Sequence, residues 1–116
     1  MGNKISPLEK DIQRAICEYL AIKGIFFWRS NNIPVFSRNN GGRMAFRSLP
    51  KFTPRGIPDI ICLHEGKFIG LEVKRPEAKL RPEQAEFGTK MVINGGFYYV
   101  VHSIEDVMSI IELSIN

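Results

Sequence analysis

Two short apolar runs, separated only by Glu65-Gly66, constrain the fold more than any other feature of the sequence. The runs cover 59–64 and 67–74, and both are rich in branched and aromatic residues that favour strands. A two-residue loop ending in glycine is typical of a β-hairpin, so we predict that the runs pair antiparallel. In that register Asp59 lies directly opposite Glu72.

This opposition of two carboxylates is the first indication of chemistry. Directly opposed side chains share one sheet face with Cβ atoms about 5 Å apart, so Asp59 and Glu72 repel each other. The apolar neighbours indicate that both faces are covered, which favours a divalent cation between the carboxylates. Lys74 lies two residues after Glu72 and therefore on the same face. Its ammonium could orient a water and stabilise charge on a phosphate, as metal-assisted phosphodiester hydrolysis requires. The alternative is a buried salt bridge from Lys74 to Asp59 or Glu72.

Helical periodicity and turn residues place this hairpin in an α/β domain. We predict a first helix over 7–23, with Ser6 as its N-cap and Glu9 completing a capping box. The whole chain of 116 residues fits one domain with a mixed central sheet flanked by helices. The other predicted elements are strands over 25–29 and 97–101 and helices over 82–93 and from Ser103 onward.

Residues 31–57 differ from the rest of the chain because asparagine, glycine and proline interrupt any long element. We predict a long loop here, and loops of this length are usually functional or mobile. Between Arg29 and Pro58 there are six basic and no acidic residues, whereas the remainder carries 10 basic and 12 acidic residues. This segregation favours a polyanionic partner on one side of the molecule. The alternative is a solvated loop with incidental charge.

The sequence offers no signal for a membrane or for disulfides. No apolar run approaches the ~20 residues of a membrane helix, and the N-terminus lacks an apolar signal core. Cys17 and Cys62 have no metal-ligand spacing, so we interpret them as small buried side chains in a reducing compartment. We expect a cytoplasmic protein, in the host cytoplasm if a phage encodes it.

Pro58-Asp59 followed by Glu72-Val73-Lys74 resembles the signature of the PD-(D/E)xK nuclease superfamily. The fuller pattern is similar to the VRR-NUC (virus-type replication-repair nuclease) domain in its stand-alone viral or phage form. The resemblance extends from about Glu9 to the last helix and implies a restriction-endonuclease-like αβββαβ core. The residues that carry it are Glu9, Gly56-Ile57-Pro58-Asp59, Glu72-Val73-Lys74, Gln84 and Gly96 before an aromatic strand.

The resemblance implies a metal site. Asp59 and Glu72 would bind Mg²⁺ or Mn²⁺, with the Val73 carbonyl as a third protein ligand. Glu9 would approach the metal from the first helix, as the helix-borne glutamate does in archaeal-type Holliday junction resolvases. On local grounds alone, Glu9 also fits the capping box.

The resemblance also implies catalytic and binding roles. Lys74 would position the attacking water and stabilise the pentacovalent phosphate. Gln84 would contact the site or the DNA from the second predicted helix, although a solvated polar residue is normal in a first turn. In the basic loop, DNA phosphates would be bound by Arg38, Arg43, Arg47, Lys51 and Arg55.

Aromatic residues near the basic loop allow base stacking at branch points, with Trp28, Phe36 and Phe46 as candidates. We favour burial in the core for Trp28.

We therefore predict a stand-alone, Mg²⁺- or Mn²⁺-dependent DNA endonuclease. Its substrate would be branched DNA such as a Holliday junction, and its context DNA repair or recombination. A homodimer would place two sites on opposed strands of a junction. One alternative is a non-catalytic DNA-binding module, which intact Asp59, Glu72 and Lys74 argue against. Another is a nuclease with a different DNA preference, such as a restriction-type enzyme that reads sequence.

Overall fold

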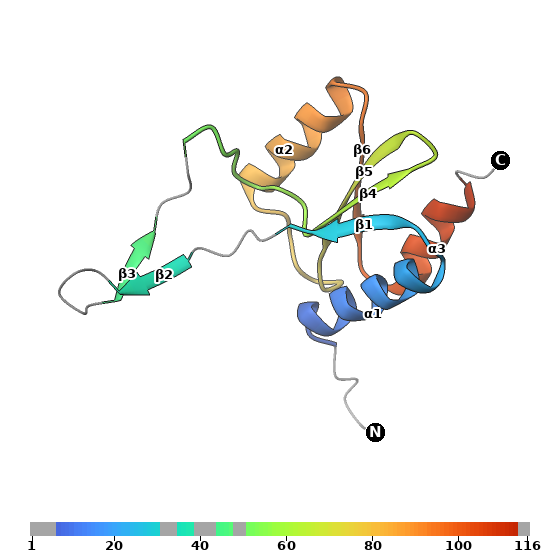
Figure 1. Cartoon of the computed structure of the whole chain (residues 1–116), viewed down its shortest axis with the longest axis horizontal. Helices are drawn as coiled ribbons and strands as arrows, with labels where there is room; N and C mark the ends of the chain where they lie inside the picture. Colours follow the sequence, from blue (N-terminus) through green and yellow to red (C-terminus); the bar gives the residue numbers. More distant parts are fainter. Residues whose placement is uncertain (1–6, 31–34, 39–43, 48–50, 114–116) are drawn as a thin grey trace.

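A computed structural model shows a four-stranded sheet packed between helices (Figure 1). It describes residues 7–30, 35–38, 44–47 and 51–113, with the backbone alone over 35–38 and 44–47. In chain order the elements are α1 (Glu9–Ile22), β1 (Phe26–Arg29), β2 (Val35–Arg38), β3 (Met44–Arg47), β4 (Ile60–His64), β5 (Lys67–Val73), α2 (Pro82–Ile93), β6 (Phe97–Val101) and α3 (Ile104–Leu113).

The main sheet has the strand order β1-β4-β5-β6. The β5–β6 pair is parallel and the other two pairs are antiparallel, so the sheet is mixed as predicted. The β4–β5 hairpin pairs His64 with Lys67 and Ile60 with Leu71, which confirms the predicted register. Glu65 and Gly66 both have positive φ angles, as a type I′ turn requires.

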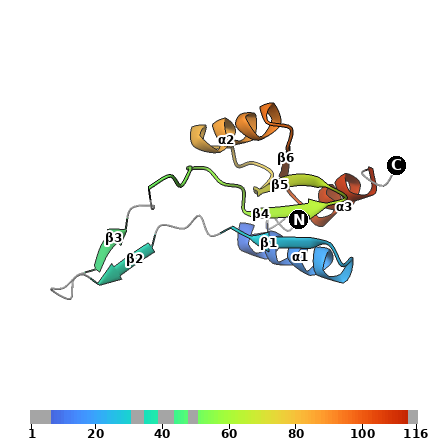
Figure 2. The same cartoon turned by 45° about the horizontal axis from the view of Figure 1, so that its top comes forward.

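Helices α1 and α3 cover one face of this sheet. Side chains spaced by about one turn along each helix contact every second residue of β4 and β5. The helical period of 3.6 residues and the strand period of two therefore place apolar side chains in the same core. Figure 2 shows α1 on one side of the sheet and α2 on the other. The core contains Ile12, Ile16, Leu20, Ile25, Ile60, Cys62, Ile69, Leu71, Val73, Val101, Val107 and Ile111.

Helix α1 begins at Glu9, two residues later than predicted. Leu8 is the N-cap, with an extended backbone, and its carbonyl accepts the N–H groups of Asp11 and Ile12 at 3.0 Å. Among the described residues, no side chain caps this helix, and Ser6 lies outside them. The predicted capping box is wrong because Glu9 is the first helical residue, whereas a capping-box glutamate is the third.

The prediction of a continuous loop over 31–57 is also wrong in part. Strands β2 and β3 pair antiparallel with Phe36 opposite Phe46 and form a separate two-stranded sheet. Each strand supplies hydrogen-bond partners to the facing backbone groups of the other. This pairing explains how the segment 31–57 contains extended structure. In Figure 1 this hairpin projects away from the main sheet.

The sheet face opposite α1 and α3 is only partly covered, and this overturns the prediction for Trp28. Helix α2 packs over β6 and β5, where Gly88 touches the Tyr98 ring and Gly70 lies against Met91. Trp28 is 41% exposed, with its ring 5.6 Å from Phe26 and 6.3 Å from Phe68. The residue is not core because no helix of the described part covers β1 on that face.

Among the described residues, no helix combines the length and apolar character needed to cross a membrane. Cys62 is buried, Cys17 is partly buried, and both thiols are free.

Candidate active site

The Asp59 carboxylate stands at the end of β4, where it reaches across to β5. Its Oδ2 accepts a hydrogen bond from the Val73 N–H at 2.8 Å. The Asp59 carbonyl accepts the Ser30 N–H at 2.8 Å, which ties the end of β1 to the same point. A slip of one residue would send Asp59 and Glu72 to opposite faces, so the observed hairpin register is what brings the two carboxylates together.

Glu72 is the most deeply buried carboxylate of this site, with 2% of its surface exposed. Its Oε1 accepts a hydrogen bond from Gln84 Nε2 at 2.8 Å. Its Oε2 is buried and has no hydrogen-bond partner among the described residues. Burial, reinforced by the Asp59 charge and opposed by Lys74, raises the pKa of Glu72 to about 8. The site therefore has a buried acceptor without a donor, and the Glu72 carboxyl keeps its proton to a higher pH than an ordinary glutamate does.

Gln84 is held at the start of α2 with its amide in one orientation. Its Oε1 accepts the Arg81 N–H at 2.9 Å, as the glutamine of a capping box does. Because that contact requires the oxygen, the NH₂ group must face Glu72. Gln84 is 8% exposed, so the alternative of a solvated first-turn residue is wrong.

Lys74 directly follows β5 and is 5% exposed. Its N–H donates to the Val101 carbonyl at 3.0 Å, and its own carbonyl accepts from His102 Nδ1 at 2.9 Å. Its ammonium lowers the pKa of Glu72, yet within the described residues it forms no ion pair with either site carboxylate at 4.0 Å or less. The alternative of a buried salt bridge is therefore not what the structure contains.

Glu9 lies close enough to contribute to the electrostatics of the site. Its charge is one of those that raise the pKa of Glu72. Among the described residues, no three acidic, histidine or cysteine side chains form a group that could hold a metal, so the role of Glu9 beside the metal stays a prediction.

Tyr98 belongs to this neighbourhood and was missed by the sequence analysis. Its hydroxyl is buried without a hydrogen-bond partner among the described residues. Burial, and then the charges of Glu72 and Asp59, raise the pKa of the phenol. The aromatic run in the sequence indicates a strand. The pairing of Tyr98 with Gly70, which places Tyr98 near the site, follows only from the order of the strands in the sheet.

The proposed DNA-contacting residues are only partly described. Lys51 and Arg55 are exposed on the segment that leads into Asp59. Arg38 and Arg47 stand in β2 and β3, where the backbone alone is described, and Arg43 lies outside the described residues. The side chains of Phe36 and Phe46 are likewise not described.

Gly56, the first residue of the Gly56-Ile57-Pro58-Asp59 motif, lies against the start of α2. It has φ of +76°, and a Cβ there would lie 2.2 Å from the Glu83 carbonyl oxygen. Gly66 has nearly the same φ of +78° but open space around it.

We expect Gly56→Ala to lower the free energy of unfolding by more than about 3 kcal/mol, because it adds a backbone clash to the cost of a positive φ. Gly66→Ala, the matched control, should cost only about 1 kcal/mol. Urea unfolding of both variants measures the difference. Equal losses would show that the close contact with α2 is unimportant.

Comparison with solved structures identifies the fold. No protein-family model matches the sequence, and no curated protein matches it either. One solved structure described as a VRR_NUC domain superposes with a TM-score of 0.60 at 22% identity, covering 90% of this chain and 94% of the other. The chain has the VRR-NUC fold. A second structure, a VRR_NUC domain protein, gives a TM-score of 0.59 at 18% identity, covering 93% of this chain and 88% of the other.

The predicted core agrees with this fold. The prediction of a restriction-endonuclease-like α/β core is confirmed, with β4 and β5 presenting the acidic pair and α2 presenting Gln84. The ordered motif, and not overall sequence identity, carried that prediction, because identity to both structures is low.

Proposed function

We propose that this chain is a metal-dependent DNA endonuclease that hydrolyses phosphodiester bonds, with branched DNA such as a Holliday junction as its substrate. The observation that carries this proposal is the opposed pair of Asp59 and Glu72 beside the buried ammonium of Lys74. The fold shared with VRR-NUC domains supports the same reaction class.

The acidic pair fits a divalent cation. Glu72 Oε2 is a buried oxygen without a partner among the described residues, and its carboxyl carries a raised pKa that a cation would lower. Oδ2 of Asp59 accepts from the Val73 N–H, and the second oxygen, Oδ1, is left to bind a cation. Asp59, Glu72 and the Val73 carbonyl would hold Mg²⁺ or Mn²⁺, both of which prefer oxygen ligands. The bound ion supplies Lewis acidity toward the phosphate.

The chain's own residues then orient and stabilise the reacting groups. Hydrolysis adds a water oxygen to phosphorus and breaks one ester P–O bond. The attacking water loses a proton to solvent, and the leaving oxygen receives one from solvent. The Lys74 ammonium positions that water and stabilises the charge that develops on the phosphate oxygens. Gln84 fixes the Glu72 carboxylate through its NH₂ group, so the ligand geometry does not need to reorganise during the reaction.

DNA reaches the site along the basic segment. Lys51 and Arg55 are exposed on this segment and can contact backbone phosphates. Trp28 is exposed on the uncovered part of the sheet, where a base can stack on its ring. A homodimer would supply two sites for the two strands of a junction. A non-catalytic DNA-binding module is the alternative, but binding alone gives no reason to bury one carboxylate beside another.

A cleavage assay tests the proposal. A four-way junction, a splayed duplex, a linear duplex and a single strand are compared with Mg²⁺, Mn²⁺ or EDTA. We expect metal-dependent cutting of the junction, reduced at least about 100-fold by Asp59→Asn. Asparagine keeps an oxygen that accepts from Val73, so the variant should fold.

Two results would contradict parts of this proposal. Tight junction binding without cutting in either metal would favour the binding module. Equal cutting of linear duplex would keep the nuclease and overturn its preference for branched DNA.

A further inference from the structure

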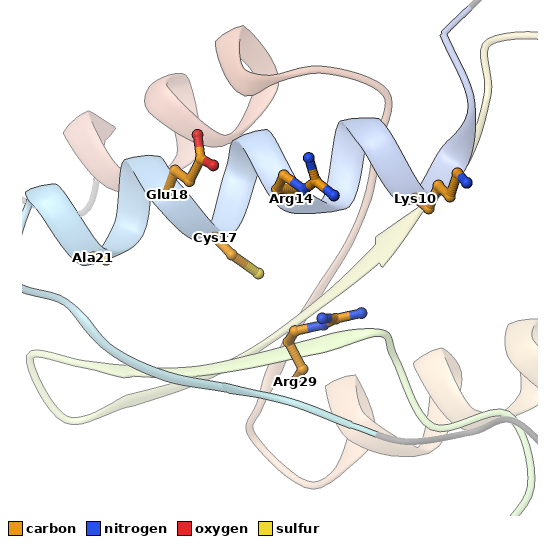
Figure 3. Close-up of a pocket in the computed structure, with 6 residues that line it drawn as sticks. All are labelled: Lys10, Arg14, Cys17, Glu18, Ala21 and Arg29. Atoms are coloured by element: carbon orange, nitrogen blue, oxygen red, sulfur yellow. The ribbon is translucent and has the colours of Figure 1, made fainter.

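A basic pocket of about 340 Å³ lies between α1 and the end of β1 (Figure 3). Figure 3 shows Arg29 rising from β1 toward the helix and the Cys17 sulfur pointing into the space between them, whereas the Glu18 carboxylate points away from β1. The pocket is lined by Lys10, Arg14, Cys17, Glu18, Ala21 and Arg29. Arg29 opens the basic window that ends at Pro58, but none of these residues is among the five predicted to bind DNA phosphates.

The cations of this pocket form no ion pairs within the part of the chain that the structure describes. Within the described residues, Lys10, Arg14 and Arg29 have no carboxylate oxygen at 4.0 Å or less. The Arg29 guanidinium is nevertheless held in place, because its Nη2 donates to Gln13 Oε1 at 2.7 Å. Three cations against one carboxylate leave a net positive pocket. Arginine also presents several donors in a fixed plane, which suits the oxygens of a phosphate.

The backbone connects the pocket to the candidate active site at two points. Lys10 follows Glu9, whose charge acts on Glu72. Arg29 precedes Ser30, whose N–H donates to the Asp59 carbonyl. A nucleic-acid strand that is cut at the acidic pair and follows the start of α1 would reach the pocket on one side of the scissile bond.

Resting on the proposed function, we propose that this pocket binds a backbone phosphate of the substrate strand next to the scissile phosphate. The contact comes from Arg14, Arg29 and Lys10, in addition to the basic segment. It carries no base identity, so it fixes the position of the strand without reading its sequence.

Binding of a fluorescent four-way junction in EDTA tests this contact without requiring cleavage. We expect Arg14→Ala and Lys10→Ala each to weaken binding about 5- to 10-fold at 100 mM salt, and to lower the salt dependence by about one released ion. Glu18→Gln removes the pocket's carboxylate and should tighten binding about 2-fold. Lys90→Ala, which changes net charge equally on the distant α2, should leave binding within 2-fold of the unchanged protein.

Alkylation of Cys17 supplies a second readout that needs no variant. Burial raises the pKa of this thiol, so labelling is followed at pH 8.5 by peptide mass mapping, with buried Cys62 as the internal reference. A bound strand should slow labelling of Cys17 at least 3-fold. Protection by pyrophosphate but not by DNA would identify a site for small anions and overturn the proposal.

The two proposals fail differently. If the unchanged protein cleaves DNA while Arg14→Ala, Lys10→Ala and Lys90→Ala bind equally well, and Cys17 stays unprotected, the pocket proposal is wrong and the nuclease stands. If binding and protection depend on the pocket but no DNA is cut, the catalytic proposal fails and the phosphate contact stands.

Discussion

Lys74→Met is expected to slow cleavage at least about 100-fold while leaving folding and DNA binding in place. Methionine has a similar length and suits a position that is only 5% exposed, so the packing survives. The ammonium forms no ion pair with the acidic pair within the described residues, so its removal leaves no broken salt bridge. What is lost is the charge that stabilises the reacting phosphate, worth about 100- to 1,000-fold in rate.

Single-turnover cleavage and equilibrium binding of the same junction separate these effects. The rate of the chemical step should fall while the dissociation constant changes less than about 3-fold. Lys90→Met makes the same substitution on an exposed part of α2, where the lysine pairs with Glu86, and should change neither quantity. A Lys74→Met protein that cuts at the normal rate would remove this residue from the mechanism.

The β4–β5 hairpin could be predicted because its information is local. A two-residue turn ending in glycine sets the register, and the register alone decides that Asp59 and Glu72 share a face. The helices over 82–93 and from residue 104 also follow from local signals, since proline opens α2 and the Ser103 hydroxyl accepts from Asp106 at the start of α3. These elements needed no knowledge of packing.

Features that depend on packing between distant elements could not be predicted. The exposure of Trp28 is decided by how far α2 extends across the sheet, and an aromatic strand sequence does not contain that information. The hydrogen bond from Gln84 joins α2 to Glu72 of β5, and Gly56 lies against the first turn of α2. Arg14 and Arg29 face one pocket only because α1 lies along β1.

The ordered set of residues that resembles the VRR-NUC pattern partly compensated for the missing information on packing. It directed attention to Gln84 on resemblance alone, before any contact with Glu72 was known. It gave no indication of Tyr98, whose hydroxyl is buried near the acidic pair.

The second large effect concerns stability, and it follows from Glu72. In EDTA, we expect the free energy of unfolding to fall as the pH rises from about 5 to 8. The pKa of Glu72 is raised from 4.5 to about 8 in the folded protein, so between these values the folded state holds a proton that the unfolded state has released. Raising the pH therefore favours unfolding. Since each pKa unit corresponds to about 1.4 kcal/mol and the group is almost fully buried, the loss should reach about 2–4 kcal/mol.

Glu72→Gln should remove most of this pH dependence and make the protein more stable than the unchanged chain at pH 8 in EDTA. The glutamine oxygen can still accept from Gln84, and its NH₂ group faces the direction of the unpartnered Oε2. Urea unfolding at pH 5, 6, 7 and 8 measures the slope. Glu112→Gln changes an exposed glutamate on α3 and should leave the slope unaltered.

Mg²⁺ should reverse the effect in the unchanged protein. A cation that binds the ionised pair stabilises the folded state by mass action, and protons compete with it, so stabilisation by Mg²⁺ should be larger at pH 8 than at pH 5. Glu72→Gln should lose most of this response, because half of the acidic pair is gone. A Glu72→Gln protein whose stability follows pH and Mg²⁺ like the unchanged chain would show that the two carboxylates do not form the metal site proposed here.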